Sequence, residues 1–300
     1  MPKWAWPMII LSVVFMLTIH VTTYNLELEK RRPSSIIQTY WRQGPRNKVF
    51  ILIPGILSRG EEQFEPLFQT FLKYGSLDVF SYVGHGFNLD QISRSVAKLI
   101  DQHIKNNKKV VLVGASLGGI VANHSLSYVI NANPLNLELI MIDTPFGVET
   151  MKAFPDRLAF LTSIYPGAPI PNVFGDRLLN SMQDLPKKQY VDTPEDVDSD
   201  AYYQEISEKA YHYLSNHRFS TWWRQLVVMV KHRPTKHSEY VMTYIRSDGQ
   251  ANDIVSQPLA SKRWKSFYPN MTIFTLSSAH CGFLQQKSRW VRMFDFILSE

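Results

Sequence analysis

Six short, nearly continuous apolar runs recur along the chain, and amphipathic stretches separate most of them. The runs cover residues 48–53, 78–83, 109–113, 137–142, 240–245 and 271–276. Strands that helices bury on both faces have this composition. Patterns with helical spacing lie between or after the runs, at residues 63–74, 89–104, 117–130 and 284–298. The alternation predicts an α/β fold with a mostly parallel, doubly wound sheet.

The alternation stops once, between Asp143 and Tyr240, where no convincing buried strand occurs. An inserted, mainly helical cap is the simplest explanation. We therefore predict an N-terminal segment (1–25), a polar linker (26–47), a first part of the core (48–145), the cap (146–238) and a second part of the core (239–300). The cap is rich in aromatic residues, which either pack it onto the sheet domain or line an apolar substrate pocket.

Composition narrows the class of protein further. A chain of 300 residues that is 45% hydrophobic can build one large core, which excludes a disordered protein. The net charge of +6 comes from scattered basic residues, a pattern that argues against nucleic acid as a partner. The single cysteine, Cys281, excludes an intramolecular disulfide framework and a cysteine-based zinc site.

Residues 4–24 are almost all apolar and carry no charge. About 20 such residues suit a single helix across a bilayer. A cleaved secretory signal is the competing interpretation, but Lys3 gives only a thin positive region and no small-x-small pair follows. We therefore expect an N-terminal membrane helix. Lys30, Arg31 and Arg32 follow it directly and place the catalytic part on the cytoplasmic side.

The pattern G-x-S-x-G occurs at Gly114-Ala115-Ser116-Leu117-Gly118, directly after the strand predicted at 109–113 and before an apolar-faced helix. In this setting the serine lies on a sharp turn that exposes its hydroxyl above the sheet. The glycines do not form a phosphate-binding loop, because neither G-x-x-x-x-G-K-[ST] nor G-x-G-x-x-G is present. We therefore predict that Ser116 is a catalytic nucleophile.

A serine hydroxyl needs a histidine to accept its proton and a carboxylate to orient that histidine. His280 is the predicted base, because it follows the last predicted strand on a short loop. Asp253 is favoured as the acid, since it lies in the loop after the strand at 240–245 and the following Ile-Val pair can pack that loop down. Asp248 in the same loop is the near rival, and Asp143 is a distant one.

A tetrahedral intermediate also needs two hydrogen-bond donors for its oxyanion. We expect one from the backbone N–H of Leu117, the residue after the nucleophile. The other is expected from Ile56, in the Pro-Gly turn that follows the first core strand. An ordinary strand-to-helix turn would favour the same Pro-Gly pair, so the second donor is the weaker inference.

Over residues 48–300 the chain resembles the α/β-hydrolase superfamily. The resemblance rests on Pro54-Gly55, the Gly84-His85-Gly86 turn, the glycine-rich turn around Ser116, the Asp253 loop and His280. It implies a sheet of the eight-stranded type, a cap inserted after Asp143 and no cofactor, and His85 looks structural. A proline replaces the histidine often found before the oxyanion glycine, which leaves the branch open.

These observations predict a membrane-anchored serine hydrolase that cleaves carboxylic esters, with an apolar or acyl-lipid ester as substrate and no metal or other cofactor. An acyltransferase, thioesterase or peptidase would use the same three residues. A non-catalytic α/β-hydrolase-like module that binds a ligand is the alternative from another class.

Overall fold

The computed structural model describes residues 5–31, 35–41, 47–56, 58–83, 87–131, 133–152, 191–193, 197–215, 219–248 and 254–299. Three predictions lie outside these residues. They concern the Gly84-His85-Gly86 turn, much of the cap between 153 and 190, and Asp253.

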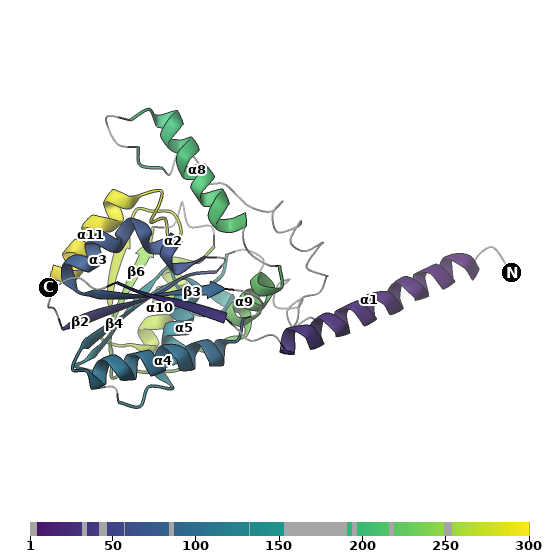
Figure 1. Ribbon diagram of the computed structural model, residues 1–300, viewed down its shortest axis with the longest axis horizontal. Helices are drawn as coiled ribbons and strands as arrows, with labels where there is room; N and C mark the ends of the chain where they lie inside the picture. The colour runs from purple at the N-terminus through teal and green to yellow at the C-terminus, as the bar shows by residue number, and fades with distance from the viewer. Residues whose placement is uncertain are drawn as a thin grey trace.

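A seven-stranded sheet forms the centre of the fold (Figure 1). The strand order is β1-β3-β2-β4-β5-β6-β7. The strands are β1 (Ser35–Trp41), β2 (Lys48–Ile53), β3 (Ser76–Val83), β4 (Lys109–Ala115), β5 (Leu137–Ile142), β6 (Val241–Ser247) and β7 (Thr272–Leu276). Strands β2 to β7 pair in parallel, as the six apolar runs predicted.

The edge strand β1 differs from the prediction, because it falls within the segment expected to be a linker. It pairs antiparallel with β3, with Ser35 opposite Val83 and Trp41 opposite Leu77. Charged residues and prolines on both sides of this short run hid its β-branched and aromatic composition in the sequence. The segment 26–47 therefore includes the last residues of α1 and a strand of the sheet.

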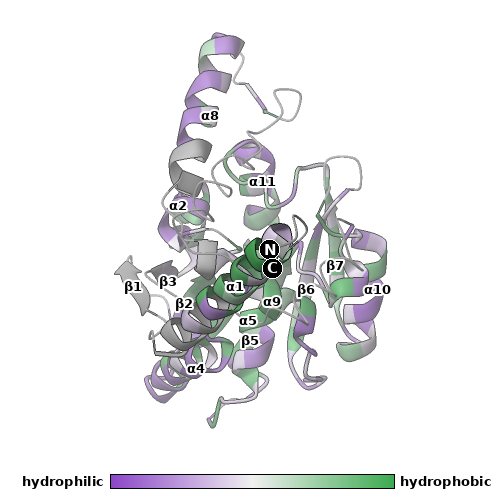
Figure 2. Ribbon diagram, turned by 90° about the vertical axis from the view of Figure 1, so that its right-hand side faces the viewer, coloured by the Kyte–Doolittle hydropathy of each residue, from purple (hydrophilic) through white to green (hydrophobic). Residues whose placement is uncertain are grey.

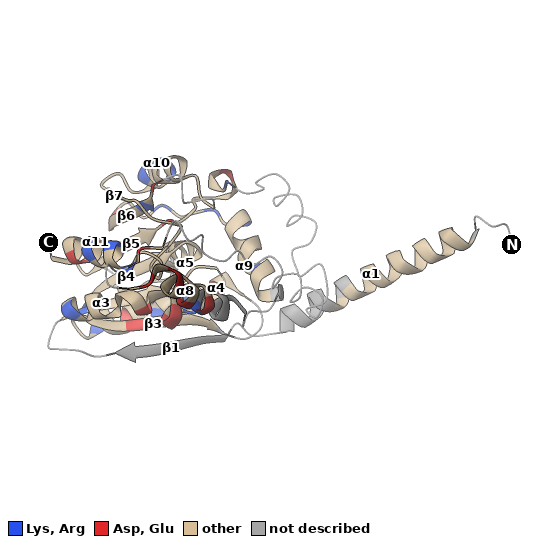
Figure 3. Ribbon diagram, turned by 90° about the horizontal axis from the view of Figure 1, so that it is seen from above, with Lys and Arg blue, Asp and Glu red and all other residues tan. Residues whose placement is uncertain are grey.

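Helices cover both faces of the sheet, as a doubly wound fold requires. They are α2 (Gly60–Phe64), α3 (Phe68–Tyr74), α4 (Leu89–Lys105), α5 (Leu117–Leu126), α9 (Phe219–Lys231), α10 (Gln257–Phe267) and α11 (Lys287–Ser299), with short 3-10 turns η1 (Glu65–Leu67) and η2 (Val148–Thr150). Helix α8 (Ser199–Ser215) instead extends beyond the sheet (Figure 1). Charged positions lie mainly on these helices, for example on α8, α10 and α11 (Figure 3). The strands between them are largely apolar.

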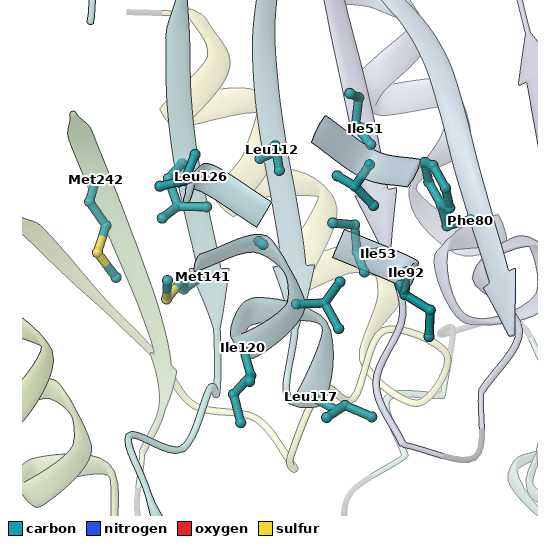
Figure 4. Packing of buried hydrophobic residues seen from close by; sticks show 14 of the residues in the cluster. Ile51, Ile53, Phe80, Ile92, Leu112, Leu117, Ile120, Leu126, Met141 and Met242 are labelled. Atoms are coloured by element: carbon teal, nitrogen blue, oxygen red, sulfur yellow. The ribbon is translucent and has the colours of Figure 1, made fainter. Parts of the chain in front are cut away.

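Side chains of alternate parity along strands β2 to β6 enter two separate cores. Residues Val49, Ile51 and Ile53 of β2 belong to the core that includes side chains of α4, α5, α9 and α10, whereas Phe50 and Leu52 belong to the core that includes side chains of α2, α3 and α11. Figure 4 shows the first core, where strand and helix side chains interdigitate: Ile51, Ile53, Leu112, Met141, Leu117 and Ile120. Both cores hold the carboxyl ends of β2, β4 and β5 side by side, which is where the predicted nucleophile lies.

Helix α1 (Ala5–Arg31) extends away from the sheet (Figure 1) and is largely hydrophobic in its described N-terminal part (Figure 2). Its apolar side chains there, such as Leu11 and Phe15, are exposed. The expected membrane helix is nevertheless not supported. Among the described residues, no helix combines the length and the apolar character that crossing a membrane requires. Thr18 and His20 interrupt the apolar run of α1, and its final turns are charged. The predicted cytoplasmic placement of the catalytic part stays a prediction.

The first turn of α5 approaches the end of β2 so closely that only glycine fits. A Cβ atom on Gly118 would lie 2.0 Å from the carbonyl oxygen of Ile53 and 2.7 Å from that of Pro54. Because both contacts are backbone atoms, Gly118→Ala should force α5 off the sheet. We expect it to lower the free energy of unfolding by at least about 1–3 kcal/mol in a denaturant titration. Gly55→Ala is the milder control, since its nearest contact would be the Ser116 Cβ at 3.3 Å.

Candidate active site

Ser116 occupies the turn between β4 and α5 in a strained backbone conformation. Its φ of 51° and ψ of −116° lie outside the regions that non-glycine residues ordinarily adopt. The backbone N–H of Ser116 donates a hydrogen bond to the Ile142 carbonyl at 2.8 Å, which anchors the turn to β5. A Cβ on Gly114 would lie 2.5 Å from the Gly119 backbone, so the glycines are what let the turn close. This is the strand-turn-helix setting that the motif predicted.

The side chain of Ser116 is buried, with 2% of the residue exposed. Within the described part of the chain, its hydroxyl oxygen has no hydrogen-bond partner. Native proteins seldom bury such a group unpaired, and exceptions commonly have a chemical role. A hydroxyl of this kind, held on a strained turn, is available to a reacting group.

His280 lies in the loop between β7 and α11, and hydrogen bonds to α11 and to the residues before it hold that loop in place. The backbone N–H of Ala279 donates to Gln286 Oε1 at 2.9 Å, and the indole N–H of Trp290 donates to Ser278 Oγ at 2.9 Å. The Cys281 thiol lies 3.9 Å from the Ile142 carbonyl oxygen, which also accepts the backbone N–H of Ser116 at 2.8 Å. The residue next to His280 and the turn that carries the predicted nucleophile are therefore joined through the same carbonyl group.

The imidazole of His280 is largely enclosed, with 12% of its side chain exposed. Neither ring nitrogen has a hydrogen-bond partner among the described residues. Burial lowers the pKa of His280 below its usual value, and the negative charge of Asp143 opposes part of that effect. The ring is consequently neutral at pH 7 and can accept a proton.

Asp143 is the carboxylate that the described residues bring to His280. Its Oδ2 lies 4.0 Å from His280 Nδ1, and the residue is fully buried. The carboxylate accepts hydrogen bonds from the Ser247 N–H at 2.7 Å, the Ser247 hydroxyl at 2.6 Å and the Cys281 N–H at 2.8 Å. Three donors compensate for burying a charged group.

The position of Asp143 follows from the strand order. It comes directly after β5, Ser247 ends β6, and the His280 loop follows β7, so the three meet at the carboxyl edge of adjacent strands. The Ser247 hydroxyl also lies 2.9 Å from the Ala279 carbonyl and so joins the two loops. From the sequence, Asp143 was only a distant rival of Asp253. Its position immediately after a buried strand is the signal that could have identified it.

The structure shows neither of the two other candidate acids beside His280. Asp248 follows β6, is exposed, and donates its backbone N–H to the Leu276 carbonyl at 2.8 Å. Asp253, the favoured acid of the sequence analysis, lies outside the described residues and stays a prediction. The described geometry therefore supports Asp143 as the acid that orients His280. Substitution of Asp143 and of Asp253 distinguishes the two candidates.

The two predicted oxyanion donors each follow a residue of the Ser116 region, Leu117 after Ser116 and Ile56 after Gly55. Leu117 is the first residue of α5, and the N–H groups of a first helical turn have no acceptor within the helix. Ile56 lies in the turn after β2, which approaches Ser116 at Gly55. The Gly55 N–H is already committed to Gln63 Oε1 at 2.8 Å, and Tyr82 donates its hydroxyl to the Pro54 carbonyl at 3.0 Å. These bonds fix the turn, while the roles of Leu117 and Ile56 stay predictions.

The ligand atoms of Asp143, His280 and Cys281 lie within 4.8 Å of one another, which is a spacing that a metal ion could use. Metals bind the thiolate form of cysteine. Burial raises the pKa of the Cys281 thiol well above its usual value, and the charge of Asp143 raises it further. Since the Asp143 oxygens are also occupied by three donors, this group suits a histidine-carboxylate pair that moves a proton better than a metal site.

Residues 50–292, most of the chain, match the model of the Alpha/beta hydrolase family. Among curated proteins, no sequence matches this chain. Solved structures with a similar fold include a carboxylesterase of the thaumarchaeon Nitrososphaera gargensis, which is 16% identical and aligns over 89% of this chain and 94% of its own with a TM-score of 0.59.

Two further structures show the same likeness in fold. An esterase of Thermogutta terrifontis is 13% identical over 88% of this chain and 93% of its own, with a TM-score of 0.58. A deformylase of Pseudomonas putida is 12% identical over 86% of this chain and 95% of its own, with a TM-score of 0.56. At these identities the likeness shows the fold alone, and the chemistry has to be argued from the site.

Proposed function

Because the chain belongs to the alpha/beta hydrolase family, we propose that it is a serine hydrolase that cleaves carboxylic esters. One observation carries the proposal. The buried, unpaired hydroxyl of Ser116 lies on a strained turn that shares the Ile142 carbonyl with the loop of His280, and a buried carboxylate, Asp143, lies beside that histidine. A nucleophile, a base and an orienting acid at the carboxyl ends of β4, β7 and β5 are what acyl transfer through serine requires.

In the proposed reaction, the Ser116 oxygen attacks the ester carbonyl while His280 accepts the hydroxyl proton. The N–H groups of Leu117 and Ile56 stabilise the oxyanion of the tetrahedral intermediate. His280 then donates its proton to the alcohol, which leaves, and an acyl group remains on Ser116. Water attacks this acyl-enzyme with His280 as base and releases the carboxylic acid. Asp143 orients His280 and stabilises its charged form.

An apolar acyl group is the substrate feature that the surroundings favour. Helix α9 packs against α5 and η2, next to the carboxyl end of β5. Its tryptophans contribute to the core, with Trp223 buried in it and Trp222 packed against it. This part of the predicted cap thus packs apolar side chains onto α5, the helix that begins after Ser116, and a cap of that character suits a substrate with a hydrocarbon chain. The esterase structures of the same fold agree with an ester substrate.

A panel of acyl substrates tests the proposal. We expect p-nitrophenyl esters to be hydrolysed, with medium or long acyl chains giving a higher kcat/KM than acetate. Matched thioesters, anilides and alcohol acceptors in the same panel separate esterase activity from thioesterase, peptidase and acyltransferase activity. A correctly folded protein that turns over none of these substrates would contradict the enzyme assignment. A strong preference for the acetate ester would contradict the proposal that the substrate carries an apolar acyl group.

The pH dependence of hydrolysis should follow the protonation of His280. Because burial lowers the pKa of His280, the neutral base persists below pH 6.5, and kcat/KM should fall only at more acidic pH. The charge of Asp143 raises that pKa, so Asp143→Asn should move the acid limb to still lower pH. A pH profile of kcat/KM at constant ionic strength measures both effects. An acid limb above pH 6.5, or one that Asp143→Asn leaves in place, would contradict this arrangement.

A further inference from the structure

Two histidines from distant parts of the chain meet outside the candidate active site. His124 lies on α5, and His232 follows the last residue of α9. Their ring centroids are 5.4 Å apart, and the ring planes are nearly perpendicular at 88°. His232 is 9% exposed, and the His124 side chain is 20% exposed. The proposed hydrolysis uses neither of them.

Each ring has a buried nitrogen with no hydrogen-bond partner among the described residues, Nδ1 in His124 and Nε2 in His232. Leaving a buried polar atom unpaired costs about 1–3 kcal/mol. An unpaired buried atom often marks an ion or a water. Here two such nitrogens belong to rings that are in contact, so one ligand could serve both.

The surroundings of His124 favour a cation as that ligand. Its Nε2 lies 2.8 Å from Asp90 Oδ1, which also accepts the Tyr128 hydroxyl at 2.9 Å. When a neutral histidine donates its Nε2–H to a carboxylate, the lone pair of the ring lies on Nδ1. Histidines that bind metals are commonly oriented by a carboxylate in this way.

The spacing of the two rings fits a shared ion. Two imidazoles on one Zn²⁺, with bonds of about 2.0–2.1 Å at a tetrahedral angle, have ring centres roughly 5 Å apart, close to the 5.4 Å between His124 and His232.

We propose that His124 Nδ1 and His232 Nε2 bind one divalent transition-metal ion, Zn²⁺ in the first instance, with water completing the coordination. Zn²⁺ accepts imidazole nitrogen readily. The ion would connect α5, whose first residue follows Ser116, to the end of α9, which belongs to the predicted cap. It would thereby fasten the cap helix to the helix behind the nucleophile without taking part in the chemistry at Ser116.

Calorimetric titration of chelator-treated, tag-free, full-length protein with Zn²⁺ at pH 7 tests this site. We expect one ion per chain, loss of that binding in His124→Gln and in His232→Gln, and about 10-fold to 100-fold weaker binding in Asp90→Asn. His103→Gln is the matched control, since His103 is also buried, lies 2.6 Å from Asp78 and has an unpaired Nδ1. His280→Gln tests whether Zn²⁺ binds instead at the group of Asp143, His280 and Cys281. Both controls should bind as wild type does.

A wild-type measurement keeps the test independent of how the variants fold. Electron paramagnetic resonance of the Cu²⁺-loaded protein should show hyperfine coupling to two imidazole nitrogens. Thermal unfolding in EDTA shows in parallel whether each variant retains the fold. Absence of Zn²⁺ binding by wild type, or binding that survives both His124→Gln and His232→Gln, would overturn the proposal. The two rings would then be packed edge to face and nothing more.

Discussion

Replacing Ser116 by alanine is expected to lower kcat for ester hydrolysis about 10⁶-fold, because no other group can form the acyl-enzyme. The fold should persist, since the Ser116 side chain makes no hydrogen bond within the described residues and is small. The free energy of unfolding should therefore change little. Hydrolysis of a chromogenic ester, with a denaturant titration of the same preparation, measures both quantities.

Cys281 supplies a control for this prediction, because its thiol contacts the Ile142 carbonyl that also accepts the Ser116 N–H. Cys281→Ser changes the packing beneath the nucleophile and keeps the reacting hydroxyl, so it should retain far more activity than Ser116→Ala. If Ser116→Ala kept wild-type turnover while folded, the nucleophile assignment would be wrong.

Replacing Asp143 by asparagine is expected to have the second largest effect, a fall in kcat of about 10⁴-fold. Removing the carboxylate of a serine triad has this effect because the histidine loses its orientation and the stabilisation of its charged form. The loss corresponds to about 5 kcal/mol of transition-state stabilisation. KM should change much less, because Asp143 is buried behind His280 and does not face the substrate.

The same substitution in the two rival acids gives the comparison that decides the assignment. Asp248→Asn and Asp253→Asn should each retain most of the wild-type kcat if Asp143 orients His280. A large loss in Asp253→Asn with little loss in Asp143→Asn would restore the acid that the sequence favoured. Because Asp143 also binds the Ser247 and Cys281 N–H groups, stability must be measured for each variant. The acid shift of the pH profile is a readout that lost stability alone would not produce.

The centre of the sheet could be predicted from the sequence because β2, β4 and β5 are buried on both faces. The bounds predicted for β2 and β5 agree with the structure to the residue, and β4 extends two residues further. Burial of both faces produces an uninterrupted apolar run, which is a strong signal. The edge strand β1 was missed since a short run flanked by charges resembles a linker. Helix α10 was not predicted either, since lysine and arginine break up its apolar spacing.

The candidate site was only partly predictable for a physical reason. Ser116 carries its own local signal, a turn that needs glycines at fixed positions. His280 is marked by its place after the last strand. The acid has no such local requirement, because any carboxylate that the strand order brings to the histidine could serve. The contact between Asp143 and His280 depends on β6 lying between β5 and β7, and on Ser247 joining the two loops.

Covalent labelling with a fluorophosphonate probe tests the central claim most directly, because the probe reacts with a serine that a neighbouring base activates. Peptide mass spectrometry of the labelled protein should locate the phosphonyl adduct on Ser116. Labelling should disappear in Ser116→Ala and should slow strongly in His280→Gln. A folded wild-type protein that remains unlabelled, or that carries the adduct on another serine, would contradict the account.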